Sequence, residues 1–199
     1  MEGGSISMSR DLSSLRAVEP ASLLDVDPGR FRYSAWRNLT IGVWADQATQ
    51  QAAERVLQVS RLMVSQHPTG HSSIVFVLDG APAPTPEANE VFAKIYDDKI
   101  SDLSCMAIVI EGGGFWASRI RSTITSLRMS TPGPMMIRVA DKLEQVLEWF
   151  PGEHSLRTGV RVTPSELKTV LTATRALVAN YNGELPLTQS QRPRRSGAP

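Results

Sequence analysis

The chain has 199 residues, of which 41% are hydrophobic and 21% charged, and its 21 basic and 20 acidic side chains give a formal net charge of +1. This near neutrality argues against nucleic acid or an anionic membrane surface as a partner, and no apolar run approaches the roughly 20 residues that span a bilayer. Cys105 is the one cysteine, which excludes an internal disulfide and a cysteine-based metal cluster and makes a reducing cytoplasm the expected location.

Two strands are predicted after a flexible N-terminal arm over residues 1–28. The arm is rich in serine and glycine, a composition typical of a chain that buries little apolar surface. Apolar and polar side chains then alternate from Phe31 to Arg37, and again from Leu39 to Trp44. Arg37 and Asn38 can turn the chain, because asparagine tolerates the left-handed backbone region. We therefore expect a hairpin at the edge of a sheet.

Three further strands are predicted, and each is separated from the next by a helix. Apolar runs place these strands at residues 73–78, 106–110 and 135–139. Apolar stripes at helical spacing predict helices that end near Gln66, Ile95, Leu127 and Phe150.

Local signals mark where these helices begin and end. Asp46 or Thr49 can cap the first helix, and Thr85 followed by Pro86 is a favourable start for the second. The glycines Gly112–Gly114 let the chain turn before the third helix. Pro151-Gly152 is predicted to end the fourth helix, with residues 151–162 as a loop or extended segment.

Together these elements predict an α/β domain over residues 29–152. Strands separated by helices must run parallel. An edge hairpin followed by a parallel βαβαβα segment therefore gives a single mixed sheet of about five strands, in two or three layers.

An extra C-terminal amphipathic helix is predicted over residues 163–182. Thr163-Pro-Ser-Glu166 is a capping box, and Asn182-Gly183 can end the helix. Its narrow apolar stripe can cover its own sheet, or it can face a second chain and form a homodimer. Residues 183–199 contain arginines among prolines and glutamines and are predicted to be a disordered basic tail, whose three arginines are a weak signal for nucleic acid.

The loop Glu111-Gly-Gly-Gly-Phe-Trp116 follows a predicted strand and is the most distinctive candidate site. Backbone N–H groups of Gly112, Gly113 and Gly114 can face an anion at a helix N-terminus, with Arg119 and Arg121 adding charge. The pattern matches neither common nucleotide-binding glycine motif. The alternative interpretation is a tight turn that needs small residues.

The other potentially reactive side chains do not indicate a catalytic site. His67, His71 and His154 lie in predicted loops without a third metal ligand nearby, and Cys105 precedes a buried strand, where a packed thiol is expected. The sequence contains neither a Gly-x-Ser-x-Gly elbow nor a recognisable triad. We therefore predict no catalytic residues, no metal and no cofactor.

Residues 31–150 resemble the STAS-like domains, the fold of the anti-sigma-factor antagonists, in the order and length of their elements. Asp79 ends the strand Val75-Phe-Val-Leu-Asp79 as in that family, and Ala107–Ile110, Phe115 and the Arg119 helix match its third strand and helix. Residues 137–147 resemble its final strand and helix. Thr85-Pro-Glu-Ala88 stands where the family has Asp-Ser-Ser-Gly, so Thr85 is the hydroxyl available for phosphorylation, or alternatively a helix cap.

The resemblance implies a non-catalytic regulatory module of the bacterial cytoplasm that binds a protein partner. It would offer the loops at residues 79–86 and 111–116, with Trp36, Trp44, Trp116 and Trp149 as possible anchors. The second hypothesis is a domain that binds a small anionic ligand or a lipid at Gly112–Gly114, over an apolar pocket, and an enzyme ranks third. An apolar cavity favours the second hypothesis, whereas a flat exposed patch around Phe115 and Trp116 favours the first.

Overall fold

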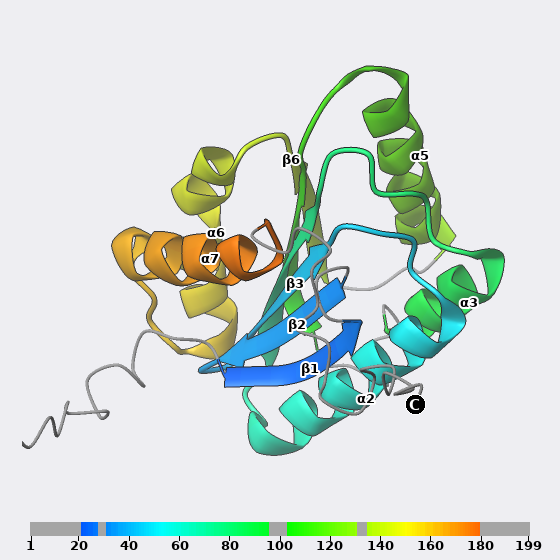
Figure 1. Ribbon diagram of the computed structural model, residues 1–199. Helices are drawn as coiled ribbons and strands as arrows, with labels where there is room; N and C mark the ends of the chain where they lie inside the picture. Colours follow the sequence, from blue (N-terminus) through cyan, green and yellow to red (C-terminus); the bar gives the residue numbers. More distant parts are fainter. Residues whose placement is uncertain (1–20, 28–30, 96–102, 131–134, 180–199) are drawn as a thin grey trace, which may run out of the picture.

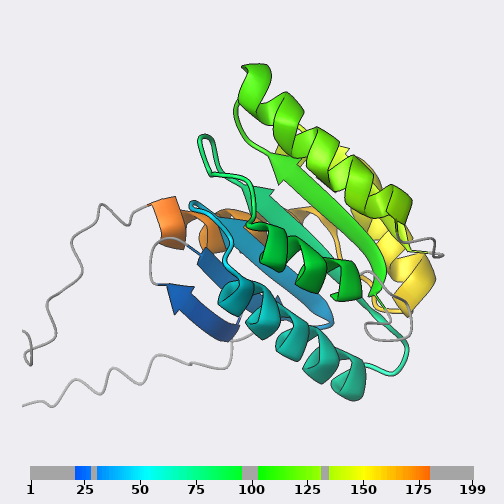
Figure 2. The ribbon, with the colours of Figure 1, turned by 90° about the vertical axis from the view of Figure 1, so that its right-hand side faces the viewer.

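The computed structural model describes residues 21–27, 31–95, 103–130 and 135–179, and it shows one six-stranded sheet (Figures 1 and 2). The strands lie in the order of the sequence, β1-β2-β3-β4-β5-β6. β1 to β3 are antiparallel neighbours, and β3 to β6 run parallel. Their bounds are β1 Ala21–Asp27, β2 Phe31–Trp36, β3 Leu39–Trp44, β4 His71–Val77, β5 Leu103–Ile110 and β6 Met136–Ala140.

The predicted mixed α/β sheet is therefore confirmed, but it contains one strand more than expected. β1 lies within the predicted N-terminal arm and pairs with β2, so the β2–β3 hairpin is not at the edge of the sheet. The register between β1 and β2 shifts twice, between Ser22 and Leu24 and between Asp25 and Asp27. Such irregularities break the two-residue alternation from which a strand is recognised.

In the part of the chain that the structure describes, five helices cover the sheet in a three-layer arrangement. They are α2 Gln50–Gln66, α3 Pro86–Ile95, α5 Gly114–Ser130, α6 Leu143–Thr158 and α7 Pro164–Ala179. The crossover helices α2, α3 and α5 cover one face of the sheet, and α6 and α7 cover the other (Figures 1 and 2). Successive parallel strands joined by crossovers of one hand place their helices on one face, which explains this division.

The fourth predicted helix, α6, does not end at Pro151-Gly152, so that boundary was wrong. It continues to Thr158, and Gly159 then ends it with a φ of 75°. The buried residues Val146, Phe150, His154 and Thr158 recur every four positions, so one face of α6 stays against the sheet on both sides of the proline. The sequence concealed this continuation because the second half of the stripe is polar.

Helix α7 begins at the predicted capping box, which the structure confirms. The Glu166 carboxylate accepts hydrogen bonds from the Thr163 N–H at 2.9 Å and from its hydroxyl at 2.7 Å, and the Glu166 N–H donates to Thr163 Oγ1 at 3.2 Å. The hydrogen bonds from Thr163 and the Arg37 guanidinium lower the pKa of Glu166 to about 2.

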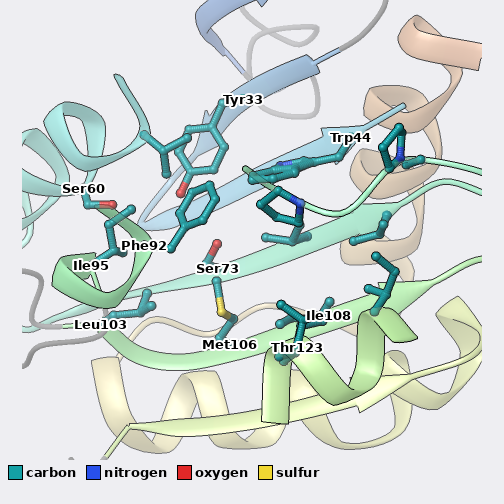
Figure 3. Close-up of a pocket in the computed structure, with 18 residues that line it drawn as sticks. Tyr33, Trp44, Ser60, Ser73, Phe92, Ile95, Leu103, Met106, Ile108 and Thr123 are labelled. Carbon is teal, nitrogen blue, oxygen red and sulfur yellow. The ribbon is translucent and has the colours of Figure 1, made fainter. Parts of the chain in front are cut away.

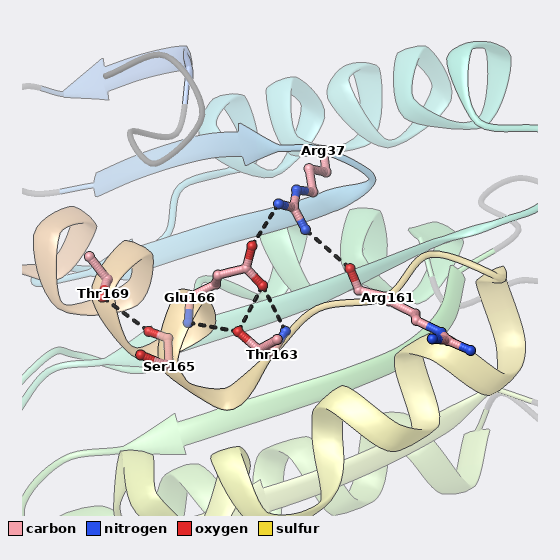
Figure 4. A network of polar contacts seen from close by, with 6 residues as sticks. All are labelled: Arg37, Arg161, Thr163, Ser165, Glu166 and Thr169. Atoms are coloured by element: carbon pink, nitrogen blue, oxygen red, sulfur yellow. Dashed lines mark hydrogen bonds and ion pairs between the residues drawn. The ribbon is translucent and has the colours of Figure 1, made fainter. Parts of the chain in front are cut away.

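Arg37 joins this capping box to the β2–β3 turn (Figure 4). Its guanidinium donates to Glu166 Oε1 at 2.8 Å and to the carbonyl oxygen of Arg161 at 3.1 Å. Arg37 also takes the left-handed conformation of the turn, with a φ of 54°, where the sequence had suggested Asn38. The contacts of the side chain with α7 offset the backbone strain of a non-glycine residue in this region.

The apolar stripe of α7 packs on its own sheet. Leu167, Val170, Leu171 and Val178 are buried in one cluster with side chains of β3, β4, β5 and α6. Of the two arrangements open to this helix, the structure thus has the one that covers its own core, and a homodimer through this stripe is not supported.

Several sequence predictions lie outside the described residues. These are residues 1–20 of the arm, the end of the last helix at residues 180–182 and the tail at residues 183–199. Among the helices that the structure describes, none combines the length and the apolar character needed to cross a bilayer.

Candidate functional site

The glycine loop after β5 is a tight turn built around Asp79. Gly112 has a φ of 91°, and a Cβ at this position would collide with the carboxylate of Asp79, which lies two residues beyond the end of the neighbouring strand β4. Gly114 also has a positive φ, of 72°, whereas open space surrounds Gly113. At Gly112 and Gly114, therefore, the turn itself accounts for the glycine.

Two of the charged side chains around this turn, Glu111 and Arg121, form ion pairs with residues outside the loop. Glu111 forms a two-bond ion pair with Arg175 of α7, with both nitrogen–oxygen distances at 2.5 Å. Arg121 pairs with Asp141 beyond the end of β6, and Arg119 is exposed on α5. The carboxylates of Glu111 and Asp141 thus neutralise the charges of Arg175 and Arg121. The structure therefore does not assemble a positively charged site at Gly112–Gly114.

Phe115 and Trp116, which follow the glycines, separate instead of forming a flat patch. The Phe115 side chain is 86% exposed. Trp116 packs against the cluster of β5 and α5, and its indole N–H donates to the carbonyl oxygen of Ala81 at 2.8 Å. This hydrogen bond joins the start of α5 to the loop at residues 79–85.

The other tryptophans proposed as interface anchors take part in internal packing. Trp36 is buried in the core. Trp44 packs against the rings of Phe31 and Phe92, each at a centroid distance of 5.0 Å. Trp149 packs against the α6 side of the core, beneath the guanidinium of Arg138.

Thr85 caps α3, as one of its two interpretations predicted. Its hydroxyl oxygen accepts a hydrogen bond from the Ala88 N–H at 3.2 Å, and its own N–H donates to the carbonyl oxygen of Ala48 at 3.0 Å. Asp46 or Thr49 was expected at the start of α2, and Thr49 occupies the cap there.

An apolar cleft opens between α3 and α5, beneath the loop at residues 81–84 (Figure 3). Side chains of β4 and β5 form its floor, α3 and α5 form its two walls, and one end reaches β2, β3 and α2. Its lining consists of Tyr33, Trp44, Val56, Ser60, Ser73, Val75, Val77, Ala81, Pro82, Pro84, Phe92, Ile95, Leu103, Met106, Ile108, Ile120, Thr123 and Ile124.

The cleft exists because α3 and α5 are not packed closely against each other. α3 packs closely against α2 but makes few contacts with α5 (Figure 2). Gly42 of β3 also gives room, since a Cβ there would lie 3.2 Å from the Tyr33 ring and 3.3 Å from the Trp44 indole nitrogen. The absence of a side chain at this position lets both rings lie beside the sheet at the end of the cleft.

The cleft is small and uncharged. Its volume is about 80 Å³, whereas pockets for drug-sized ligands span about 300–1,000 Å³. Its described lining has no acidic, basic or histidine side chain. A site of this size and composition fits a small apolar molecule or the apolar end of a larger one.

The opposite face of the sheet buries a polar group that the sequence did not reveal. The Ser72 hydroxyl lies 2.9 Å from His154 Nδ1, and the Cys105 thiol donates to Ser72 Oγ at 3.2 Å. All three side chains are buried. Burial lowers the pKa of His154 to about 4 and raises that of Cys105 to about 11, so both are neutral at pH 7. With no access to solvent, this Ser–His contact is unsuited to nucleophilic catalysis.

Two of the three histidines, His71 and His154, are not in loops as predicted. His154 lies in α6, and His71 is the first residue of β4, where burial lowers its pKa to about 4. His67 follows the last residue of α2. Cys105 is a packed thiol, as expected. Within the described ranges, no group of three or more histidine, cysteine or acidic side chains is placed to hold a metal ion.

No protein-family model matches this sequence, and no curated protein is significantly similar to it. Functional proposals for this chain therefore depend on its own residues and on the resemblance described above.

Replacing Gly112 by alanine should destabilise the protein by about 1–3 kcal/mol, because the methyl group meets the Asp79 carboxylate and the backbone conformation is unfavourable for alanine. Gly113→Ala is the matched control, since nothing lies within 4 Å of a Cβ there. Urea denaturation measures both free energies of unfolding. Equal stabilities of the two variants would contradict this account of the turn.

Stability should also fall in mild acid. The pKa of His154 is about 4 in the folded chain against 6.5 as its ordinary value, so its contribution is complete above pH 6.5 and is lost as the pH falls towards 4. The loss amounts to at most about 3–4 kcal/mol for this residue. In denaturation at several pH values, His154→Gln should lose less stability over this range than the unaltered chain. If the free energy of unfolding fell equally with pH in both proteins, His154 would not be buried in its neutral form.

Proposed function

We propose that this protein is a non-catalytic binding domain that takes a small apolar molecule into the cleft between α3 and α5. The observation that carries the proposal is the cleft itself, whose floor is the apolar face of β4 and β5 and whose described lining is uncharged. Removing apolar surface from water contributes about 25 cal/mol per Å² to the free energy of binding. An apolar ligand that covers this floor therefore binds without a charged partner.

The position of the cleft supports the same proposal. The cleft runs along β4 and β5, and its end beneath the loop at residues 81–84 lies at the carboxyl ends of these parallel strands, where ligands commonly bind to α/β sheets. The loop at residues 81–84 forms one lip, and the hydrogen bond from Trp116 to Ala81 holds that lip against α5. The Ser–His contact that would suggest catalysis is sealed on the other face, which favours binding over chemistry. We place this activity in the cytoplasm, where a lone thiol stays reduced.

A variant that fills the cleft from its wall tests this function. Thr123 lines the cleft, while its neighbour Ser122 is exposed on α5 and does not. Toluene titrated into the unaltered protein should cause saturable shifts of the methyl resonances of Ile108 and Ile120. Thr123→Trp should weaken this binding at least tenfold, and Ser122→Trp should leave it unchanged.

Two outcomes would refute the proposal. One is the absence of saturable shifts at these methyl groups in the unaltered protein. The other is an equal effect of the two tryptophan variants, because this would place the binding site elsewhere.

A second candidate function is the STAS-like protein-interaction and regulatory module that the sequence resemblance implies. The observation in its favour is Phe115, which is 86% exposed at the start of α5, next to the Trp116 contact with the loop at residues 79–85. Aromatic side chains, phenylalanine among them, are enriched in protein–protein interfaces.

A photo-crosslinking phenylalanine analogue at position 115 tests this second candidate in the source cell. Leu156 of α6 is 81% exposed and far along the chain, so the same analogue at position 156 is the matched control. The candidate predicts one discrete adduct that forms from position 115 and not from position 156. Adducts of the same masses from both positions, or none from position 115, would count against it.

A further inference from the structure

The inner end of the cleft carries three hydroxyl groups from three different elements. Tyr33 comes from β2, Ser60 from α2 and Ser73 from β4, and their exposed fractions are 3%, 1% and 1%. Figure 3 shows the three oxygens turned towards one another beside the Phe92 ring. The remainder of the cleft is mainly aliphatic and aromatic. The cleft is therefore amphipathic along its length, with one polar end.

The hydrogen bonds at this end leave capacity for another group. The Tyr33 hydroxyl donates to Thr40 Oγ1 at 3.0 Å, and Thr40 Oγ1 donates in turn to the carbonyl oxygen of Ser72 at 3.3 Å. Burial raises the pKa of Tyr33, and the hydroxyls of Thr40, Ser73 and Ser60 oppose this rise, so all of them lie close to the phenol. Ser73 Oγ nevertheless has no well-aligned hydrogen-bond partner among the described residues.

A buried hydroxyl without a well-formed hydrogen bond lowers the free energy of unfolding. A ligand that forms a hydrogen bond with this hydroxyl removes the penalty. A hydroxyl group offers one donor and two acceptor positions, so Ser73 can bind either an alcohol or a carbonyl oxygen. A charged group in the same place would lose its hydration without an opposite charge to replace it, since the described lining carries none.

We propose that the cleft selects an uncharged ligand with an apolar body and a single hydroxyl or carbonyl group, which binds at the hydroxyl end beside Ser73. This inference rests on the proposed function and specifies its ligand class. Short-chain alcohols and ketones fit the class in size and chemistry, whereas carboxylates and ammonium ions of the same length do not. Ser73 is then the residue that determines the preference for a polar group over pure hydrocarbon.

Three probes of similar size test the inference on the full-length chain: 1-hexanol, toluene and hexanoate. Chemical-shift titration at pH 7 should give an affinity for hexanoate at least tenfold weaker than for 1-hexanol. Ser73→Ala should weaken 1-hexanol binding about three- to tenfold, the range expected for one hydrogen bond, and should change toluene binding by less than twofold. Ser60→Ala provides a second variant in case Ser73→Ala fails to fold, and a smaller loss confined to 1-hexanol is expected from it.

The possible failures are distinguishable. If none of the probes binds, both the proposed function and this inference are wrong. If toluene and 1-hexanol bind but both serine variants leave 1-hexanol unaffected, the cleft binds apolar molecules without the hydroxyl recognition inferred here. Hexanoate that binds as tightly as 1-hexanol would overturn the exclusion of charge.

Discussion

The apolar face of β4 and β5 on the side of the crossover helices is the feature on which the binding proposal depends. These two strands lie inside the sheet, so both of their faces must be covered. On one face, α6 and α7 complete the cover with a continuous cluster of buried side chains. On the other, α2 and α3 pack as a pair, and α5 leaves part of the strand floor accessible. The cleft is the space that this uneven cover leaves.

Two sets of polar contacts fix the layers on either side of this floor. Arg37 and the Thr163–Glu166 capping box hold the start of α7 to the β2–β3 turn, and the Glu111–Arg175 ion pair holds α7 to the end of β5. On the cleft side, the Trp116–Ala81 hydrogen bond holds the start of α5 to the loop above the cleft. Because α5 is held to the loop above the cleft and makes few contacts with α3, an accessible cleft is compatible with a stable fold.

The features that could be predicted from the sequence are those that local chemistry specifies. Thr49, Thr85 and Thr163 each stand where a short polar side chain can accept a helix N–H, and each caps its helix in the structure. The parallel strands were recognisable because a strand covered on both faces is almost uniformly apolar. The tight-turn interpretation of the glycine loop also depended on local geometry, since only a residue without a Cβ fits at Gly112.

The remaining features depend on contacts between distant segments. α6 continues past Pro151 because His154 meets Ser72, 82 residues earlier in the chain. β1 was missed because its pairing with β2 is irregular. The hydroxyl end of the cleft joins Tyr33, Ser60 and Ser73, whose sequence context gives no sign of a shared site. The gap between α3 and α5 depends on how far apart these helices lie on the sheet, which a one-dimensional pattern does not encode.

Xenon binding measures most directly whether the floor of β4 and β5 is an accessible apolar cavity, because xenon occupies dry apolar cavities and makes no hydrogen bonds. In crystals of the protein exposed to xenon under pressure, the account predicts a xenon peak between α3 and α5, in contact with Phe92 and Ile108. A structure in which α5 lies flat against α3, with no xenon over these strands, would contradict it.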